Sequence, residues 1–388
     1  MTDPVKVRGT KQSRPKTDAS TGLIECRWTN PYYLWVPRSS DPTNWCSGVY
    51  VAKLTALKSK TESFIPFVVR DDARSAAHLF QLSVTTYQAY NAWGGKSLYQ
   101  FNSTNGRAFK VSFNRPYDDG YGTGNLITEW SGWEYNMLRF LEREGYDLNY
   151  CTNLDTHTSP SLLSNHRSFL SIGHDEYWSW QMRQNVEAAR DKKAMHLGFF
   201  TANACYWQVR FENDYLLQPN RTMVCYKEDY QRDPYYPVLS RRKYTTVTWR
   251  DPIVNLPEDK LIGVMYEYNP VKGDIIVENT NHWVYENSGL NDGDRIVGLL
   301  GYEVDRIFGN APAPVTRLAH SPYATETGTN FADMTIYTLP NGATVFATGT
   351  IQWAWGLDDL FAGVLHPNYV NPAVKQITRN VMNRFTRA

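Results

Sequence analysis

Residues 167–180 read RSFLSIGHDEYWSW, and this stretch decides the fold class. Its first half, SFLSIG, is a short apolar run of the kind that forms buried β-strands. The run breaks into His174, Asp175 and Glu176, and two large aromatic residues follow. A buried strand that ends in three polar side chains predicts an α/β sheet with functional groups at one edge, because loops converge beyond the carboxyl ends of parallel strands.

Three further strands are predicted around this one, at residues 77–84, 146–152 and 196–201. One helix is predicted to follow a capping box formed by Ser131 and Glu134, and another to begin near Ser179. Strands that alternate with helices favour a mainly parallel sheet covered on both faces. We therefore expect an α/β fold with a sheet of the amidotransferase-like or flavodoxin-like kind.

The rest of the chain divides by composition. Residues 1–21 carry basic side chains among Thr, Ser and Pro, which is typical of a disordered tail. Residues 22–70 alternate between apolar and polar residues and predict a small antiparallel β unit. We expect the α/β domain to span 71–388, with a β-rich insertion at about 205–330 and a β-rich elaboration toward the C-terminus.

Later elements are predicted from local signals. Within the insertion, strands are expected at 244–249 and 274–279. A hairpin is expected over 334–349 because Asn341-Gly342 is a strong two-residue turn signal. Pro372 opens a terminal helix, whose apolar stripe consists of Val374, Ile377, Val381 and Phe385.

Composition excludes several classes of function. Forty Lys and Arg against 39 Asp and Glu leave a net charge of +1, which gives no field to hold nucleic acid or an anionic membrane. No apolar run approaches the roughly 20 residues of a membrane span, and the N-terminus lacks the apolar core of a signal peptide. We expect a cytoplasmic location, with a secreted mature form left open. The five cysteines stand far apart, so we expect reduced, buried thiols.

Polar side chains follow all four predicted strands of the sheet. They are Tyr87, Tyr90 and Asn91, then Asn153 and Asp155, then His174, Asp175 and Glu176, then Thr201 and Asn203. Four polar strand ends predict one site at the carboxyl edge of the sheet. For Asp155 and Asn203, helix capping is the alternative. For Cys205, a buried thiol is favoured over a nucleophile.

Glu176 is the least ordinary of these residues because aromatic side chains flank it. A carboxylate shielded from water needs a cation, a metal ion or a raised pKa. His174 alone would more often be structural, but its position two residues before Glu176 favours a functional pair. Five tryptophans are candidates for the walls of a small dry pocket: Trp93, Trp178, Trp207, Trp353 and Trp355. The signatures of serine hydrolases, zinc proteases and dinucleotide enzymes are absent from the sequence.

Several longer stretches carry a family resemblance: TTYQAYNAWGGKSLYQFN (85–102), SIGHDEYWS, TANACYWQVRFE, RTMVCYK, GYEVDR and TGTIQWAWGLDD. With these motifs the sequence resembles the family named for the large (beta) subunit of N,N-dimethylformamidase, from about residue 41 to the C-terminus. The named enzyme has an additional small subunit, and its two ligand tyrosines lie farther apart in sequence than the matching pair here.

The resemblance implies a mononuclear iron(III) held by two tyrosine phenolates and one glutamate. Glu176 matches the glutamate, Tyr90 matches one tyrosine with Tyr87 as its rival, and Tyr99 matches the other. Around the metal the resemblance places three more residues, His174, Asn203 and Glu303. The implied reaction is hydrolysis of the C–N bond of a small amide.

The chemistry of the side chains agrees with this set. Three hard anionic oxygens select a hard trivalent ion over zinc, and phenols ligate only when a strong Lewis acid displaces their protons. Glu303 would then take a proton from water, while His174 and Asn203 would steady the oxyanion or the leaving amine.

Two alternatives stay open. The first is a ligand- or carbohydrate-binding protein without a metal, which the Trp-rich stretch QWAWG would serve. The second is a metal hydrolase that cleaves another bond. The expected partner is a small amide, without nucleic acid or membrane, and the sequence leaves homo-oligomerisation and a small subunit open.

Overall fold

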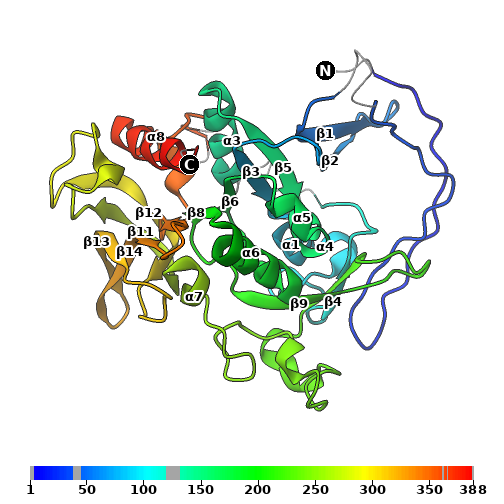
Figure 1. The fold of residues 1–388 in the computed structure, drawn as a ribbon. Helices are drawn as coiled ribbons and strands as arrows, with labels where there is room; N and C mark the ends of the chain where they lie inside the picture. The colour runs from blue at the N-terminus through cyan, green and yellow to red at the C-terminus, as the bar shows by residue number, and fades with distance from the viewer. Residues whose placement is uncertain (1–3, 38–44, 119–131, 361, 365, 387–388) are drawn as a thin grey trace.

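The computed structural model describes residues 4–37, 45–118, 132–360, 362–364 and 366–386. Its centre is a seven-stranded mixed sheet with the order β13-β14-β15-β8-β6-β3-β5 (Figure 1). The five strands from β15 to β5 are parallel, and β13 and β14 run antiparallel at one edge. The strands are β3 (His78–Leu82), β5 (Leu148–Thr152), β6 (Ser168–Gly173), β8 (His196–Thr201), β13 (Thr316–Thr325), β14 (Gly328–Thr338) and β15 (Thr344–Ala347).

The order of the parallel strands determines where a site can form. Numbered along the chain, β3, β5, β6, β8 and β15 lie in the spatial order 2-1-3-4-5, which is also the order of flavodoxin-like sheets. In this order the chain leaves β3 toward one side of the sheet and β6 toward the other. The crevice beyond the carboxyl ends of β3 and β6 is therefore the expected place for a ligand.

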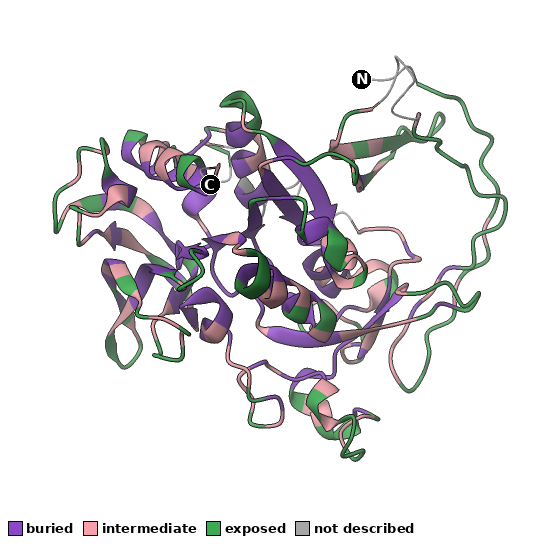
Figure 2. Cartoon of the chain, in the orientation of Figure 1, coloured by how far each residue is buried: buried purple, intermediate pink, exposed green. Residues whose placement is uncertain are grey.

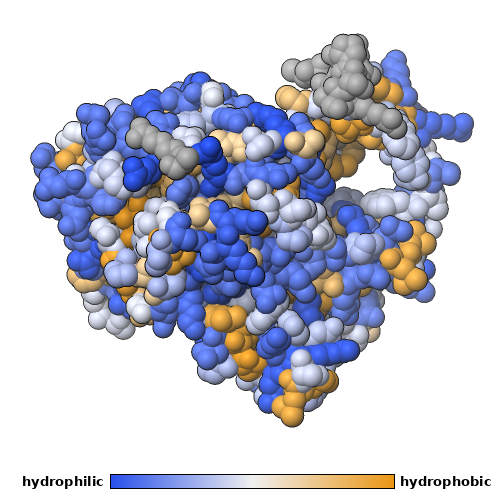
Figure 3. Space-filling view, in the orientation of Figure 1, coloured by the Kyte–Doolittle hydropathy of each residue, from blue (hydrophilic) through white to orange (hydrophobic). Residues whose placement is uncertain are grey.

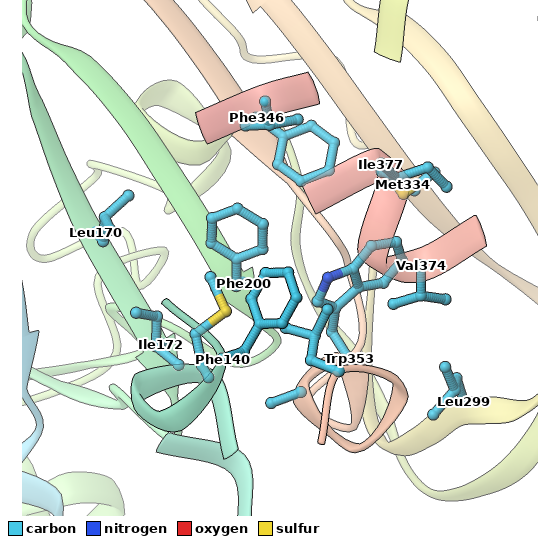
Figure 4. Close-up of a cluster of buried hydrophobic side chains, with 14 of the residues drawn as sticks. Phe140, Leu170, Ile172, Phe200, Leu299, Met334, Phe346, Trp353, Val374 and Ile377 are labelled. Carbon is cyan, nitrogen blue, oxygen red and sulfur yellow. The ribbon is translucent and has the colours of Figure 1, made fainter. Parts of the chain in front are cut away.

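Alternate residues of each parallel strand pack against opposite layers. On one face, Leu170, Ile172 and Phe200 pack with side chains of α3 (Gly132–Arg143) and α8 (Pro372–Thr386), as Figure 4 shows in part. On the other face, Phe169 and Phe199 pack with α5 (Pro160–Leu163) and α6 (Trp180–Lys193). The central strands are buried along almost their whole length, as a sheet covered on both faces requires (Figure 2).

The remaining strands form three smaller sheets. They are a hairpin of β1 (Gly48–Thr55) and β2 (Glu62–Val69), a long pair of β11 (Met265–Ile276) and β12 (Arg295–Arg306), and a four-stranded sheet of β4 (Lys110–Ser112), β10 (Thr222–Val224), β9 (Trp207–Glu212) and β7 (Tyr177–Ser179). The short helices are α1 (Val84–Tyr90), α4 (Asn153–Thr158) and α7 (Asp259–Ile262). On the surface, apolar side chains gather on the β1–β2 hairpin (Figure 3).

Most of the predicted elements are confirmed. The four strands around residues 167–180, the helix after Ser179, the hairpin through Asn341-Gly342 and the apolar stripe of α8 are present and buried as expected. Ser131 lies outside the described residues, so the expected capping box is not described. Among the helices that are described, none is long and apolar enough to cross a bilayer.

The strand predicted at 244–249 is wrong. These residues form a 3-10 turn and bends, with a single bridge between Thr248 and Trp207. Side chains take the backbone groups that a strand would pair: Asp233 accepts the N–H of Thr246 at 2.9 Å, and Gln208 donates to the carbonyl of Thr245 at 2.8 Å. The strand predicted at 274–279 is the last part of β11, which ends at Ile276.

Gly173 closes β6 in a conformation that favours glycine. Its φ is +70°, and a Cβ there would lie 2.8 Å from Cγ of Glu134 and 3.3 Å from Cβ of Trp133. The close approach lets α3 lie against the end of β6, directly before His174. A side chain at this position would push apart the two elements that meet beneath the site.

We expect Gly173→Ala to destabilise the protein more than Gly145→Ala does. Gly145 has a φ of +76° with open space around it, so its alanine variant carries only the backbone strain, about 1–2 kcal/mol. Gly173→Ala adds overpacking of about 1–3 kcal/mol. Urea denaturation measures both free energies of unfolding. Equal losses in the two variants would contradict the close packing of α3 on β6.

Candidate metal centre

The candidate site lies beyond the carboxyl ends of β3 and β6. Tyr90 is the last residue of α1, which follows β3, and Glu176 lies in the turn after β6. Tyr99 comes from the loop between the 3-10 turn at Trp93–Gly95 and β4. Glu303 comes from β12, outside the main sheet. The site therefore lies where the strand order reverses, as predicted for a sheet of this topology.

The structure brings the three predicted ligands together. The hydroxyl of Tyr99 donates to Glu176, at 3.0 Å from Oε1 and 2.9 Å from Oε2, and the hydroxyl of Tyr90 donates to Oε2 at 3.3 Å. The two rings lie 4.2 Å apart between centroids. Glu176 is 3% exposed. Two phenols thus converge on one buried carboxylate.

Tyr87 takes no part in this convergence. It is fully buried, and its hydroxyl donates to Glu134. Burial raises the pKa of Glu134 to about 8, so at neutral pH this carboxyl is largely protonated. Of the two tyrosines that the sequence left as rivals, Tyr90 is the one whose hydroxyl reaches Glu176.

A histidine and a second carboxylate stand beside the phenols. Nε2 of His174 lies 3.2 Å from Oε2 of Glu303 and 3.3 Å from Oε2 of Glu176. Asn269 donates to Oε1 of Glu303 at 3.1 Å. His174 is 8% exposed and Glu303 is 5% exposed, so the charges on this pair are shielded from water.

Burial and charge oppose each other in the protonation of this pair. Burial would lower the pKa of His174, but the charges of Glu303 and Glu176 raise it to about 9. Burial would raise the pKa of Glu303, but the charge of His174 and hydrogen bonds from His174, Asn203 and Asn269 hold it below its ordinary value. At neutral pH the pair is an imidazolium next to a carboxylate.

Asn203 is held over the site by its backbone. Its φ is +56°, and its N–H donates to Oδ1 of the buried Asp305 at 2.8 Å. The side chain of Asn203 hydrogen-bonds Glu303. Asp155, the other residue with a capping alternative, forms the capping box of α4 with Thr152, so the capping alternative is confirmed there. A catalytic role for Asn203 stays a prediction.

Sequence reasoning missed two residues of the site. Lys227 is 3% exposed, and its Nζ lies 3.4 Å from the ring centroid of Tyr99. Burial lowers the pKa of Lys227 to about 8, although the charge of Glu176 opposes this. Tyr177 donates its hydroxyl proton to the hydroxyl oxygen of Tyr99 at 2.5 Å. Tyr177 follows Glu176 directly, so its position was a signal, whereas nothing local marks Lys227.

Arg115 fixes the loop that carries both tyrosines. Its guanidinium donates to four backbone carbonyls, those of Gln88 (3.2 Å), Asn91 (2.8 Å), Trp93 (3.3 Å) and Lys96 (2.6 Å). It is only 5% exposed. Four carbonyls on one planar cation leave the loop between the two tyrosines little freedom.

Asp175 fixes the turn that carries His174 and Glu176. It is fully buried and accepts hydrogen bonds from Gln81 (2.8 Å), Asn153 (2.9 Å) and Ser171 (2.8 Å). These donors come from the ends of three neighbouring strands. Some of the polar residues at the strand ends therefore face the site, and others fix the position of the turn that carries the site residues.

The other candidates have structural positions. Cys205 is fully buried, and burial raises its thiol pKa well above the ordinary value, which disfavours a nucleophile. Trp178 and Trp353 belong to the two cores of the sheet. Trp133, which the sequence did not single out, packs edge-on against His174 at 6.2 Å and stacks on Trp355.

Phe101 marks the outer side of the site. Its side chain is 63% exposed, and its ring lies 5.4 Å from that of Tyr99, which is partly buried. A cleft of about 410 Å³ lies elsewhere, between Trp180, Arg210 and Tyr244. The phenol–carboxylate cluster is therefore not part of that cleft.

The donor set fits a hard metal ion only if the phenols take part. Within the described parts of the chain, no group of three or more His, Cys, Asp and Glu side chains has the arrangement of a metal site. Nε2 of His174 and Oε2 of Glu303 face each other at 3.2 Å, and Oδ1 of Asn203 is buried without a hydrogen bond to the described residues. Two phenols and one carboxylate are hard oxygen donors, so this donor set suits a hard metal ion.

We expect Arg115→Met to destabilise the protein by more than about 3 kcal/mol, because each buried carbonyl left without a donor costs about 1–3 kcal/mol. Arg295→Met is the control, since Arg295 is solvent-exposed and faces Asp274 at 3.6 Å, where an ion pair contributes about 1 kcal/mol or less. Urea denaturation gives both values. Similar losses in the two variants would show that Arg115 does not hold the tyrosine loop.

Comparison with known families agrees with the geometry. The family model described as N,N-dimethylformamidase beta subunit-like, C-terminal, matches residues 1–371. The match spans the whole candidate site, from Tyr90 to Glu303, and most of the chain. No curated protein matches this sequence.

Proposed function

Because the chain belongs to the N,N-dimethylformamidase beta subunit-like family, we propose that it hydrolyses the C–N bond of small linear amides. Tyr90, Tyr99 and Glu176 would hold a mononuclear iron(III). One observation carries the proposal: two phenol hydroxyls converge on the buried Glu176 carboxylate beside the His174–Glu303 pair. A purely structural cluster has no need of a second buried carboxylate next to the first.

The phenols are suited to a metal and not to free ionisation. Burial, followed by the negative charge of Glu176, raises the pKa of both Tyr90 and Tyr99 well above the ordinary value. Without a cation both hydroxyls therefore keep their protons and donate hydrogen bonds to Glu176. Iron(III) bound at these three oxygens would supply Lewis-acid chemistry toward the carbonyl of an amide.

Glu303 is the proposed general base. Asn269 donates to its Oε1, while its Oε2 faces Nε2 of His174 at 3.2 Å. The low pKa of Glu303 keeps it ionised at neutral pH. Ionised and oriented by Asn269, the carboxylate would accept a proton from the attacking water.

His174 is the proposed acid. Its imidazolium lies between the two carboxylates, and its raised pKa keeps the proton available at neutral pH. In amide hydrolysis the leaving amine must gain a proton, and an imidazolium next to the base can donate it. Asn203, held by Asp305, would orient the oxygen of the tetrahedral intermediate through its amide.

The surroundings favour a small, weakly polar substrate. Phe101 and Trp133 lie against the cluster as apolar surfaces, through the rings of Tyr99 and His174. Two cations, His174 and Lys227, balance the two carboxylates of Glu176 and Glu303. A neutral amide with alkyl groups on nitrogen suits such a site better than a charged one.

The carbohydrate-binding alternative receives less support. It depended on the stretch QWAWG, whose tryptophans have other contacts. Trp353 is fully buried and donates to Oγ1 of Thr378 at 3.0 Å, and Trp355 stacks on His366 at 4.3 Å. Neither presents a free face as a platform for a sugar ring. The other alternative is that the same metal cleaves another kind of bond. Assays with substrates that contain such bonds test it.

Glutamine variants separate the ligand from the base. We expect Glu176→Gln to lose both iron and amidase activity, since an amide is a far weaker ligand than a carboxylate. Glu303→Gln should keep iron and lose turnover by about 100-fold or more, the usual contribution of a general base.

Metal analysis and turnover of N,N-dimethylformamide and related amides measure both variants. Glu134→Gln is the control, because this buried carboxyl is neutral at pH 7 and bonds Tyr87 outside the cluster. Full iron occupancy in Glu176→Gln, or its loss in Glu303→Gln, would refute the division of roles.

Colour tests the phenolate ligands. A phenolate oxygen on iron(III) gives a visible charge-transfer band, so the purified protein should be coloured. We expect Tyr90→Phe and Tyr99→Phe each to weaken or shift the band and to lower iron content, because each removes one ligand. Tyr87→Phe should leave the band unchanged, since Tyr87 bonds Glu134. A colourless, iron-free protein that still hydrolyses amides would refute the iron assignment.

A further inference from the structure

A third phenol touches the cluster. Tyr177 is fully buried, and its hydroxyl donates to the hydroxyl oxygen of Tyr99 at 2.5 Å. Tyr99 in turn donates to Glu176, so the three residues form a chain of hydrogen bonds that runs toward the carboxylate. Tyr177 has not been given a role in the proposed reaction.

The fold fixes the position of Tyr177 from several sides. It is the first residue of β7, where it pairs with Trp207 of β9 in a parallel register. Its carbonyl accepts a hydrogen bond from Oγ1 of Thr85 at 2.9 Å. Its ring packs in a small core with Ala89 and Leu98, which flank the tyrosine loop. The hydroxyl therefore reaches Tyr99 from a rigid support.

The direction of the hydrogen bond matters for Tyr99. When Tyr99 gives up its proton, its oxygen keeps the hydrogen bond from Tyr177, which then becomes charge-assisted and stronger. The ammonium of Lys227, 3.4 Å from the ring centroid of Tyr99, adds a positive charge on the ring face. Both contacts stabilise negative charge on Tyr99.

We propose that Tyr177 is a positioning residue that donates a hydrogen bond to the Tyr99 phenolate and reduces the electron density that this oxygen gives to the metal. The inference rests on the proposed function, since it assigns Tyr99 as a ligand. Hydrogen bonds to a ligand atom are a general means of tuning a metal site. Here the donor is an uncharged phenol, which adds no charge to the cluster.

Tyr177 as a ligand in place of Tyr99 is the competing assignment. The hydroxyl of Tyr99 contacts both oxygens of Glu176, whereas the hydrogen bond of the Tyr177 hydroxyl goes to Tyr99. The hydroxyls of Tyr90 and Tyr99 therefore both contact the Glu176 carboxylate, whereas the hydroxyl of Tyr177 contacts only the hydroxyl of Tyr99 in these hydrogen bonds. The geometry favours a donor over a ligand.

The test compares Tyr177→Phe with the wild type by adding iron(III) to protein freed of metal. We expect the charge-transfer band to persist at full intensity, to move to longer wavelength, and iron affinity to fall about 10–100-fold, because the phenolate loses its hydrogen bond. Tyr337→Phe is the control. Tyr337 is also buried and donates to the carbonyl of Leu261 at 2.6 Å, far from the cluster in sequence and in contacts. Its variant should match the wild-type band.

A second variant separates electronic tuning from packing. Replacing Tyr177 with 3-fluorotyrosine keeps the ring in place but makes the phenol a stronger donor, so the band should move to shorter wavelength. This variant also serves if Tyr177→Phe does not fold.

The outcomes distinguish this inference from the proposed function. A coloured wild type with an unmoved band in both Tyr177 variants would overturn the tuning role alone. Loss of about half the band intensity together with iron in Tyr177→Phe would make Tyr177 a ligand. A wild type that binds no iron(III) would overturn the proposed function and the tuning role together.

Discussion

The burial of the Glu176 carboxylate is the constraint on which the rest of the site depends. A carboxylate that is 3% exposed must be compensated by hydrogen bonds and positive charge, or it takes up a proton. Burial raises the pKa of Glu176, and the cations His174 and Lys227 oppose this rise. The two phenols supply the hydrogen bonds. The two phenols, His174 and Lys227 thus compensate the buried carboxylate, a role that a bound metal ion would share.

Two buried groups convert this electrostatic requirement into geometry. Asp175 accepts hydrogen bonds from the ends of neighbouring strands and so fixes the turn that carries Glu176. Arg115 donates to carbonyls of the loop that carries the tyrosines and so fixes that loop. In these hydrogen bonds, neither group contacts Tyr90, Tyr99 or Glu176 through its charged atoms. Because a planar guanidinium and a three-fold accepting carboxylate allow few alternatives, the fold itself directs the phenols toward Glu176. The buried charges of such a site lower the stability of the folded protein. In return, the side chains need little rearrangement when a ligand binds.

The sequence predicted the sheet well because its strands carry continuous apolar runs, and β6 and β8 begin and end where the pattern places them. It failed at 244–249, where Thr and Val alternate as in a strand but Asp233 and Gln208 take the backbone partners. At the site, motif resemblance supplied Tyr90, Tyr99 and Glu176, which periodicity alone could not have paired. Lys227 was beyond both methods, since its contact with Tyr99 depends on tertiary packing and a left-handed backbone at φ +53°.

The chemistry is divided between two parts of the fold. The parallel sheet and its loops supply the phenols, Glu176 and His174, whereas Glu303, Asn269 and Asp305 come from the β11–β12 pair. Two contacts join the two parts at the site: the N–H of Asn203 after β8 donates to Asp305, and Nε2 of His174 faces Oε2 of Glu303 at 3.2 Å. Because Glu303 lies two residues before Asp305 on the same strand, the bond to Asp305 also sets how close the proposed base stands to the proposed ligands. In the proposed assignment, proton transfer therefore depends on the register between the two parts, whereas all three proposed metal ligands come from the parallel sheet and its loops.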